Sequence, residues 1–227
     1  MSCLNEQCKQ SLVLKVGARF SPLSQVQVQE VLSKVQTHHP HIHFDISYIP
    51  TMGDIDLQKS LRTLEKTNFF TKEIDELLLN GDCRIGIHSA KDLPHPLLQG
   101  LELVCITESI DSSDSLVLQH HLTLETLPYQ AVIATSSIRR EERVRELKPD
   151  VCFIDLRGTI HQRLAKLETG EAHGVVIAEA AIIRLGLQHL NRLKLPGEGV
   201  EGQGQLAVLA RENDREIYEL FHCIDVR

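Results

Sequence analysis

The stretch Ile85-Gly86-Ile87-His88-Ser89-Ala90-Lys91-Asp92-Leu93-Pro94 joins a short apolar run to a polar end. Its alternating isoleucines predict a buried strand, and Pro94 stops the pairing because proline has no N–H for a ladder. In an α/β sheet, such a strand delivers the residues at its carboxyl end into a crevice. We therefore expect a strand that ends at Asp92 and presents a serine, a lysine and a carboxylate to a ligand. The alternative interpretation is a surface turn of mixed charge.

Strands and helices are predicted to alternate along the whole chain. The expected strands cover residues 12–17, 42–49, 85–92, 101–106, 131–134, 151–155, 174–177 and 206–209. Helices are expected from Pro22 to about residue 37, from Phe69 to 79, from 160 to about 167 and from 214 to 221. Two more are expected, one that begins after residue 137 and one that ends at residue 185. Residues 55–68 are polar and weakly periodic, which predicts a mobile loop. This alternation predicts an α/β protein with ligands at the carboxyl ends of its strands.

Two changes in composition divide the chain. Residues 108–114 are rich in Ser and Asp, and residues 201–204 are rich in Gly. Such segments favour loops, so both are candidate crossings between lobes. We expect one lobe from residues 1–108 with 205–227, and a second lobe from residues 109–204.

The composition limits the partners of the chain. Its 227 residues include 42% hydrophobic and 24% charged residues, which is typical of a soluble globular protein. The net charge of −7 argues against nucleic acid as a partner, because phosphate binding needs a basic face. Neither a signal peptide nor an apolar run long enough for a bilayer is visible. We expect a cytoplasmic protein that does not bind membranes.

Cysteine and histidine give little sign of metal chemistry. The six cysteines lack CxxC spacing, and Cys83, Cys105 and Cys152 lie in apolar runs that predict small core residues. Histidines 38, 39, 41 and 43 have no carboxylate or cysteine at ligand spacing. We therefore predict no metal site.

Three strand-to-helix turns carry the same kind of side chains. Each combines hydroxyls and helix-start amides with guanidinium groups: Arg19 and Ser21; Thr135, Ser136, Ser137, Arg139 and Arg140; Arg157, Thr159 and Arg163. A guanidinium group forms bidentate hydrogen bonds with a carboxylate or a phosphate, so these turns predict a site for a small polyanion. Two alternatives remain: Arg19 pairs with a surface acid, and Arg143 and Arg145 form a solvated helix face.

Several motifs, taken in order, resemble the porphobilinogen deaminase (hydroxymethylbilane synthase) family. The resemblance runs from about Leu12 to Arg211. It rests on the motifs at residues 88–94 (His-Ser-Ala-Lys-Asp-Leu-Pro), 134–140 (Ala-Thr-Ser-Ser-Ile-Arg-Arg), 156–159 (Leu-Arg-Gly-Thr), 184–187 (Arg-Leu-Gly-Leu) and 202–204 (Gly-Gln-Gly). The sequence departs from the family at Ala134, where Gly is usual, at 68–70, where Gly-Leu-Phe is common, and at Gln205, where Ala is usual.

The resemblance implies a specific fold and activity. The family has two lobes like those of type II periplasmic binding proteins, with mixed sheets, flanking helices and an active site in the interlobe cleft, plus a small third domain. It is a transferase that condenses four molecules of porphobilinogen into hydroxymethylbilane for haem and other tetrapyrroles, releasing ammonia. The growing chain is held on a dipyrromethane cofactor, attached through a thioether to a cysteine of the third domain.

The resemblance also assigns roles to residues. Asp92 matches the catalytic aspartate, which stabilises positive charge on pyrrole nitrogens. The groups that match cofactor-binding positions are Lys91, Ser89, Arg139, Arg140, Thr135, Ser136, Ser137 and Arg157. Those that match substrate-binding positions are Arg19, Ser21 and Arg163. The expected partner is a small anionic pyrrole, and the protein is expected to be a monomer.

The printed sequence ends at Arg227, before the segment that holds the cofactor cysteine in the family. The expectation is therefore that the third domain is absent; Cys223 lies near the end but in no matching motif. Two functions stay open: an active transferase of this type, and a two-lobed protein that binds linear pyrroles or other small polycarboxylates with impaired turnover.

Overall fold

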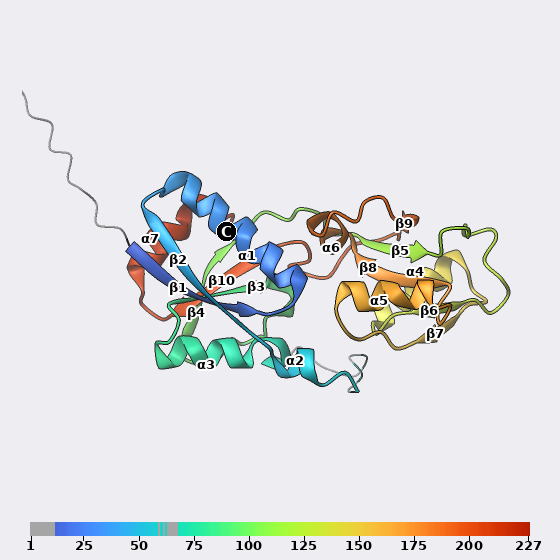
Figure 1. Cartoon of the computed structure of the whole chain (residues 1–227), viewed down its shortest axis with the longest axis horizontal. Helices are drawn as coiled ribbons and strands as arrows, with labels where there is room; N and C mark the ends of the chain where they lie inside the picture. Colours follow the sequence, from blue (N-terminus) through green and yellow to red (C-terminus); the bar gives the residue numbers. More distant parts are fainter. Residues whose placement is uncertain (1–11, 59, 61, 63–67) are drawn as a thin grey trace, which may run out of the picture.

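The structure, a computed structural model, describes residues 12–58, 60, 62 and 68–227. Its strands form two five-stranded sheets, in the orders β2-β1-β3-β10-β4 and β7-β6-β8-β5-β9. Figure 1 shows these sheets side by side along the long axis, each with its own helices. In the described residues, no helix is long and apolar enough to span a membrane.

The first sheet has a helical layer on each face. It comprises β1 (Leu12–Arg19), β2 (Ile42–Ile49), β3 (Ile85–Ser89), β4 (Leu101–Ile106) and β10 (Leu206–Arg211). Helices α1 (Pro22–His38) and α7 (Arg215–Phe221) pack on the face that carries Val16 and Val208. Helix α3 (Lys72–Asn80) packs on the opposite face, where Leu78 meets Leu209. Side chains of one strand point alternately to the two faces, so β10 contributes to both cores.

The second sheet is built in the same way. It comprises β5 (Asp114–Leu118), β6 (Val132–Ala134), β7 (Cys152–Ile154), β8 (Gly174–Ala178) and β9 (Arg192–Lys194). Helix α4 (Ile138–Leu147) covers one face, on which Val144 is buried. Helices α5 (Ile160–Glu168) and α6 (Glu179–Arg184) cover the other.

Each crossing between the sheets supplies one antiparallel strand. β5 follows the first crossing and pairs Asp114 with Ala178 at the end of β8; β10 follows the second and pairs Leu206 with Ser89 at the end of β3. The parallel strands of both sheets therefore direct their carboxyl ends towards the crossings. The division at residues 108/109 and 204/205 stays a prediction.

Predicted helix ends agree with the observed caps. Ser21 caps α1, with its Oγ accepting from the Ser24 amide at 3.2 Å, and Pro22 occupies the first turn. Gly81 ends α3 with φ of 81°, a left-handed conformation that glycine adopts without a Cβ clash. Ser137 stands at the N-cap of α4, but its side chain makes no capping hydrogen bond.

Several predicted boundaries were wrong. β3 ends at Ser89, and residues Ala90–Asp92 form a 3₁₀ turn. The helix expected from Phe69 is instead a 3₁₀ turn, Asn68–Phe70, followed by α3. Short helix α2 (Met52–Ile55) extends into the start of the predicted loop at 55–68; within that loop, residues 59, 61 and 63–67 lie outside the described residues.

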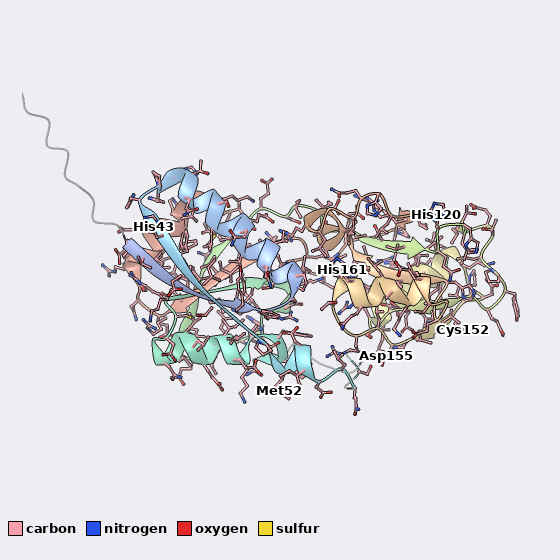
Figure 2. The ribbon with its side chains drawn as sticks, viewed as in Figure 1. His43, Met52, His120, Cys152, Asp155 and His161 are labelled. Atoms are coloured by element: carbon pink, nitrogen blue, oxygen red, sulfur yellow. The ribbon has the colours of Figure 1, made fainter. Side chains whose placement is uncertain are left out.

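Three further differences come from tertiary context. β5 and β9 were not predicted, because each is completed by partners distant in sequence. Cys152 is exposed rather than buried, since β7 is the edge strand of its sheet; Cys83 and Cys105 are buried as predicted. In Figure 2, Cys152 lies at the end of the second sheet that is far from the first.

Candidate functional site

A cavity of about 650 Å³ lies between the two sheets and is lined from both. This volume is in the range of small-molecule sites. Of the twelve predicted site residues, eleven line it: Arg19, Ser21, Ser89, Lys91, Asp92, Ser136, Ser137, Arg139, Arg140, Arg157 and Arg163. The twelfth, Thr135, is fully buried behind the wall, and its Oγ1 has no hydrogen-bond partner in the described part of the chain.

Asp92 shares one part of the cavity with two cations. The 3₁₀ turn after β3 carries Lys91 and Asp92, and Arg163 projects from the first turn of α5. Burial and the charge of Arg140 lower the pKa of Lys91 to about 8, while Asp92 opposes this shift. Burial also lowers the pKa of Arg163 to about 10, again opposed by Asp92. Both groups are cationic at neutral pH, and no described carboxylate lies within ion-pairing distance of either. They are therefore available to an anionic ligand.

Arg19 is held by an acid of its own lobe. Its guanidinium forms an ion pair with Asp54, in which Nε lies 3.2 Å from Oδ2. The same carboxylate accepts from the backbone and hydroxyl of Thr51, so it is fixed at the start of α2. The ring of Phe70 lies under Arg19, 4.6 Å from the guanidinium carbon. The alternative that Arg19 pairs with an acid therefore holds, but the pair lines the cavity.

Arg157 reaches from the second lobe to the backbone of the first. Its Nη2 donates to the carbonyl oxygens of Gly53 at 3.0 Å and Asp56 at 2.7 Å, while its Nε is buried without a partner in the described chain. A Cβ on Gly53 would lie 2.1 Å from the Phe70 ring. Gly53 is thus needed for the close packing of α2 against Phe70, and this packing places the carbonyl that Arg157 contacts.

Arg139 and Arg140 share one carboxylate. Asp114 accepts from Arg139 Nη2 at 2.5 Å and from Arg140 Nη2 at 2.6 Å, and its side chain is only 3% exposed. Burial opposes ionisation of Asp114, but Arg140 and Arg139 outweigh it and lower its pKa. Gln203 donates to the same carboxylate at 3.1 Å.

The hydroxyl groups of the site have different environments. Ser89 Oγ accepts from Gln27 Nε2 at 2.9 Å, which ties the end of β3 to α1. Ser136 Oγ accepts from the Leu156 amide at 2.7 Å and so joins the ends of β6 and β7. These two serines hold the ends of their strands in place, whereas the hydroxyl of Thr135 makes no hydrogen bond to any residue that the structure describes.

Sequence reasoning missed four polar residues of this region: Asp54, His88, Asp114 and Gln203. His88 lines the cavity, is buried, and has its pKa lowered to about 3 by burial and the charge of Arg19, so its imidazole is neutral. Asp114 and Gln203 lie in the two segments predicted as crossings, which was the available signal for their position. Nothing in the local sequence indicated that they meet.

The sequence of the chain is similar to those of known proteins. The sequence model described as porphobilinogen deaminase, dipyromethane cofactor binding domain, matches residues 14–219. The chain belongs to the porphobilinogen deaminase family. A probable porphobilinogen deaminase of Chlamydia pneumoniae is 35% identical, with 97% of this chain and 95% of the relative covered. The porphobilinogen deaminase of Synechococcus elongatus is 37% identical, with 93% and 68% covered.

Solved structures with similar folds are more distant in sequence. The regulatory domain of OxyR2 from Vibrio vulnificus superposes with a TM-score of 0.53 at 14% identity, covering 95% of each chain. The effector-binding domain of BenM gives 0.55 at 11% identity, covering 94% of this chain and 91% of BenM's. These matches concern the fold alone. The predicted family and the two-lobed fold of the type II periplasmic-binding-protein kind are both confirmed.

Proposed function

We propose that this chain is a hydroxymethylbilane synthase that works in the cavity between its lobes. The reaction joins four porphobilinogen molecules: each step forms a carbon–carbon bond from an aminomethyl carbon to a pyrrole carbon and releases ammonia, and water completes the product. The single observation that carries the proposal is the juxtaposition of Asp92 with Lys91 and Arg163 in a cavity lined by further arginines. A substrate with acetate and propionate arms has the charge that these groups require.

Asp92 has the chemistry to act as the catalytic residue. A carboxylate that faces a bound pyrrole stabilises the positive charge that develops on the ring nitrogen when ammonia leaves. The cations around it would hold the ligand's carboxylates and prevent them from competing for the ring nitrogen. Lys91 and Arg163 would bind first, because neither pairs with a carboxylate among the described residues, whereas Arg19 would have to share its pairing with Asp54.

The residues of the cavity fit a dipyrromethane cofactor. Among the residues that line the cavity, buried polar atoms without a partner in the described chain include Arg139 Nε, Arg157 Nε and Gln203 Oε1. Such groups are costly unless a ligand pairs with them, and together they offer donors to carboxylates and an acceptor to a pyrrole N–H. Ser89, Lys91, Arg139, Arg140 and Arg157, with residues 135–137, would hold the cofactor. When bound, dipyrromethane supplies the pyrrole end onto which substrate units are added.

The test combines product analysis with one isosteric change. The purified chain is incubated with porphobilinogen, and ammonia, hydroxymethylbilane and the intact protein mass are measured. We expect ammonia and product from the wild type; a covalent adduct of dipyrromethane size would further support the transferase. Asp92→Asn should abolish turnover and leave porphobilinogen affinity largely unchanged, since the cations are untouched. Turnover that survives in Asp92→Asn would remove the aspartate from its role.

A second function is binding of linear pyrroles without turnover, for which the same cationic lining of the cavity would suffice. It predicts porphobilinogen or hydroxymethylbilane binding with no ammonia and no adduct. Under either function we propose a monomeric, cytoplasmic protein with no nucleic-acid or membrane partner. Sedimentation at micromolar concentration tests the monomer.

A further inference from the structure

Asp114 occupies a special position in the fold. It is the last residue of the first crossing and the first residue of β5, where it pairs with Ala178 at the carboxyl end of β8. Its carboxylate therefore lies at the edge of the second sheet that faces the cavity. It does not line the cavity itself, but Arg139 and Arg140 stand between it and the ligand space.

The carboxylate is fixed from several sides. Gln203, from the second crossing, donates through Nε2 to Asp114 Oδ1 at 3.1 Å, to the Ser112 carbonyl at 2.7 Å and to the Ser113 carbonyl at 3.0 Å. Gln203 is itself 2% exposed. Residues of both crossings thus hold Asp114 in one position. A buried carboxylate held in this way restricts the rotamers of the arginine side chains that bind it.

The two arginines depend on this anchor to a high degree. They are neighbours on the first turn of α4, where their charges repel and their long side chains would otherwise sample many rotamers. Arg139 has one further acceptor, the Glu198 carbonyl at 3.0 Å. For Arg140, Asp114 is the one side-chain acceptor found among the described residues. Each guanidinium donates to Asp114 from one of its nitrogens, so its other N–H groups remain for a ligand.

We propose that Asp114 is a positioning residue that orients Arg139 and Arg140 towards the ligand's carboxylates from behind. The inference rests on the proposed function only for the identity of the ligand. If Asp114 has this role, removing its negative charge weakens anion binding, even though the charge lies beside an anion site. Simple electrostatics predicts the opposite: loss of Asp114 would make the pocket more positive and tighten binding.

The binding test uses Asp114→Asn, Asp114→Glu and a matched control, Glu179→Gln. Glu179 is also buried in the second lobe and pairs with Arg192 at 2.8 Å, but it does not line the cavity. We expect Asp114→Asn to weaken porphobilinogen binding at least tenfold by calorimetry. Asp114→Glu keeps the charge but is one methylene too long for a 3%-exposed slot, and should not restore the affinity. Glu179→Gln should bind as the wild type does. Unchanged or tighter binding by Asp114→Asn, or full affinity in Asp114→Glu, would overturn the proposal.

A second measurement needs no ligand and separates this inference from the proposed function. The rates at which phenylglyoxal modifies Arg139 and Arg140 are followed by peptide mass spectrometry. Both arginines should react several times faster in Asp114→Asn than in the wild type, and at the wild-type rate in Glu179→Gln. Equal rates in Asp114→Asn and the wild type would show that the carboxylate does not hold them. If the wild type fails to bind porphobilinogen, the proposed function falls and these rates still decide the role of Asp114.

Discussion

The guanidinium of Arg184, at the end of α6, donates to the carboxylate of Glu30 in α1, with Nε 2.7 Å from Oε2. This ion pair joins the two lobes directly. Arg184 also donates from Nη2 to the carbonyl of Gly204 at 2.9 Å, in the second crossing, and its side chain is only 3% exposed. One guanidinium therefore links the second lobe both to the first lobe and to the chain that connects them.

Arg184→Met should lower the free energy of unfolding by about 2 kcal/mol, because charged hydrogen bonds are lost and a buried carbonyl is left unpaired. Glu30 keeps Lys34 as a partner at 3.1 Å, which limits the loss. Urea denaturation measures it. The control is Lys72→Met, which breaks an exposed pair with Glu76 and should cost less than about 0.5 kcal/mol. Equal effects of the two changes would mean that the interlobe pair adds nothing.

Arg140→Leu should weaken porphobilinogen binding by roughly tenfold to a hundredfold, the value of one or two charge-assisted hydrogen bonds. Arg145→Leu is the matched control on the same helix. Arg145 is 53% exposed and packs over the Phe153 ring at 4.7 Å, as expected for a solvated helix face. Calorimetry of both variants separates a site arginine from a surface arginine. A dissociation constant unchanged in Arg140→Leu would remove this residue from the site.

The pH dependence of binding should reflect Lys91. Burial and the charge of Arg140 lower its pKa to about 8, with Asp92 and Asp114 opposing and Arg163 adding to the shift. Below pH 8 the ammonium is charged and attracts a carboxylate; above pH 8 it loses the proton, so affinity should fall. In Lys91→Arg the charge persists, and the fall between pH 8 and 9.5 should be much smaller. The same fall in both proteins would assign the titration to another group.

The sequence predicted the residues that line the cavity better than it predicted the acidic residues that hold them in place. Residues such as Arg19, Ser89 and Arg157 were found because strand ends in an α/β sheet follow from periodicity, and side chains at those ends share one edge. Asp54 and Asp114 were not found because each acts on an arginine 35 or 25 residues away, through a contact that only the folded chain creates.

The errors in the fold have a similar origin. β5 was missed because its five residues, Asp114–Leu118, follow directly on a loop-like run of Ser and Asp, and their strand character comes from pairing with β8. The strand expected to reach Asp92 stops at Ser89, because its antiparallel partner β10 begins at Leu206, opposite Ser89. The pairing partner, rather than Pro94, sets where this strand ends.

Asp75 should make the stability of the first lobe depend on pH. This carboxyl in α3 is 1% exposed, and burial raises its pKa to about 6; the charges of Glu73 and Glu76 add to the shift, and a hydrogen bond from Thr71 at 2.7 Å opposes it. The folded state thus holds the proton more tightly than the unfolded state, where the pKa is 3.8. Stability is therefore greatest below about pH 4 with respect to this group, and is lost as pH rises to about 6.

Asp75→Asn removes the ionisable group and keeps an acceptor for Thr71. It should raise the free energy of unfolding by about 1–2 kcal/mol at pH 8, because no charge is then buried, and the gain should disappear towards pH 4. Thermal denaturation at a series of pH values provides the measurement. Asp82→Asn, at an exposed residue after α3, is the control and should show no such pH-dependent gain. A gain for Asp75→Asn that is the same at pH 4 and pH 8 would show that packing, and not the buried charge, sets the effect.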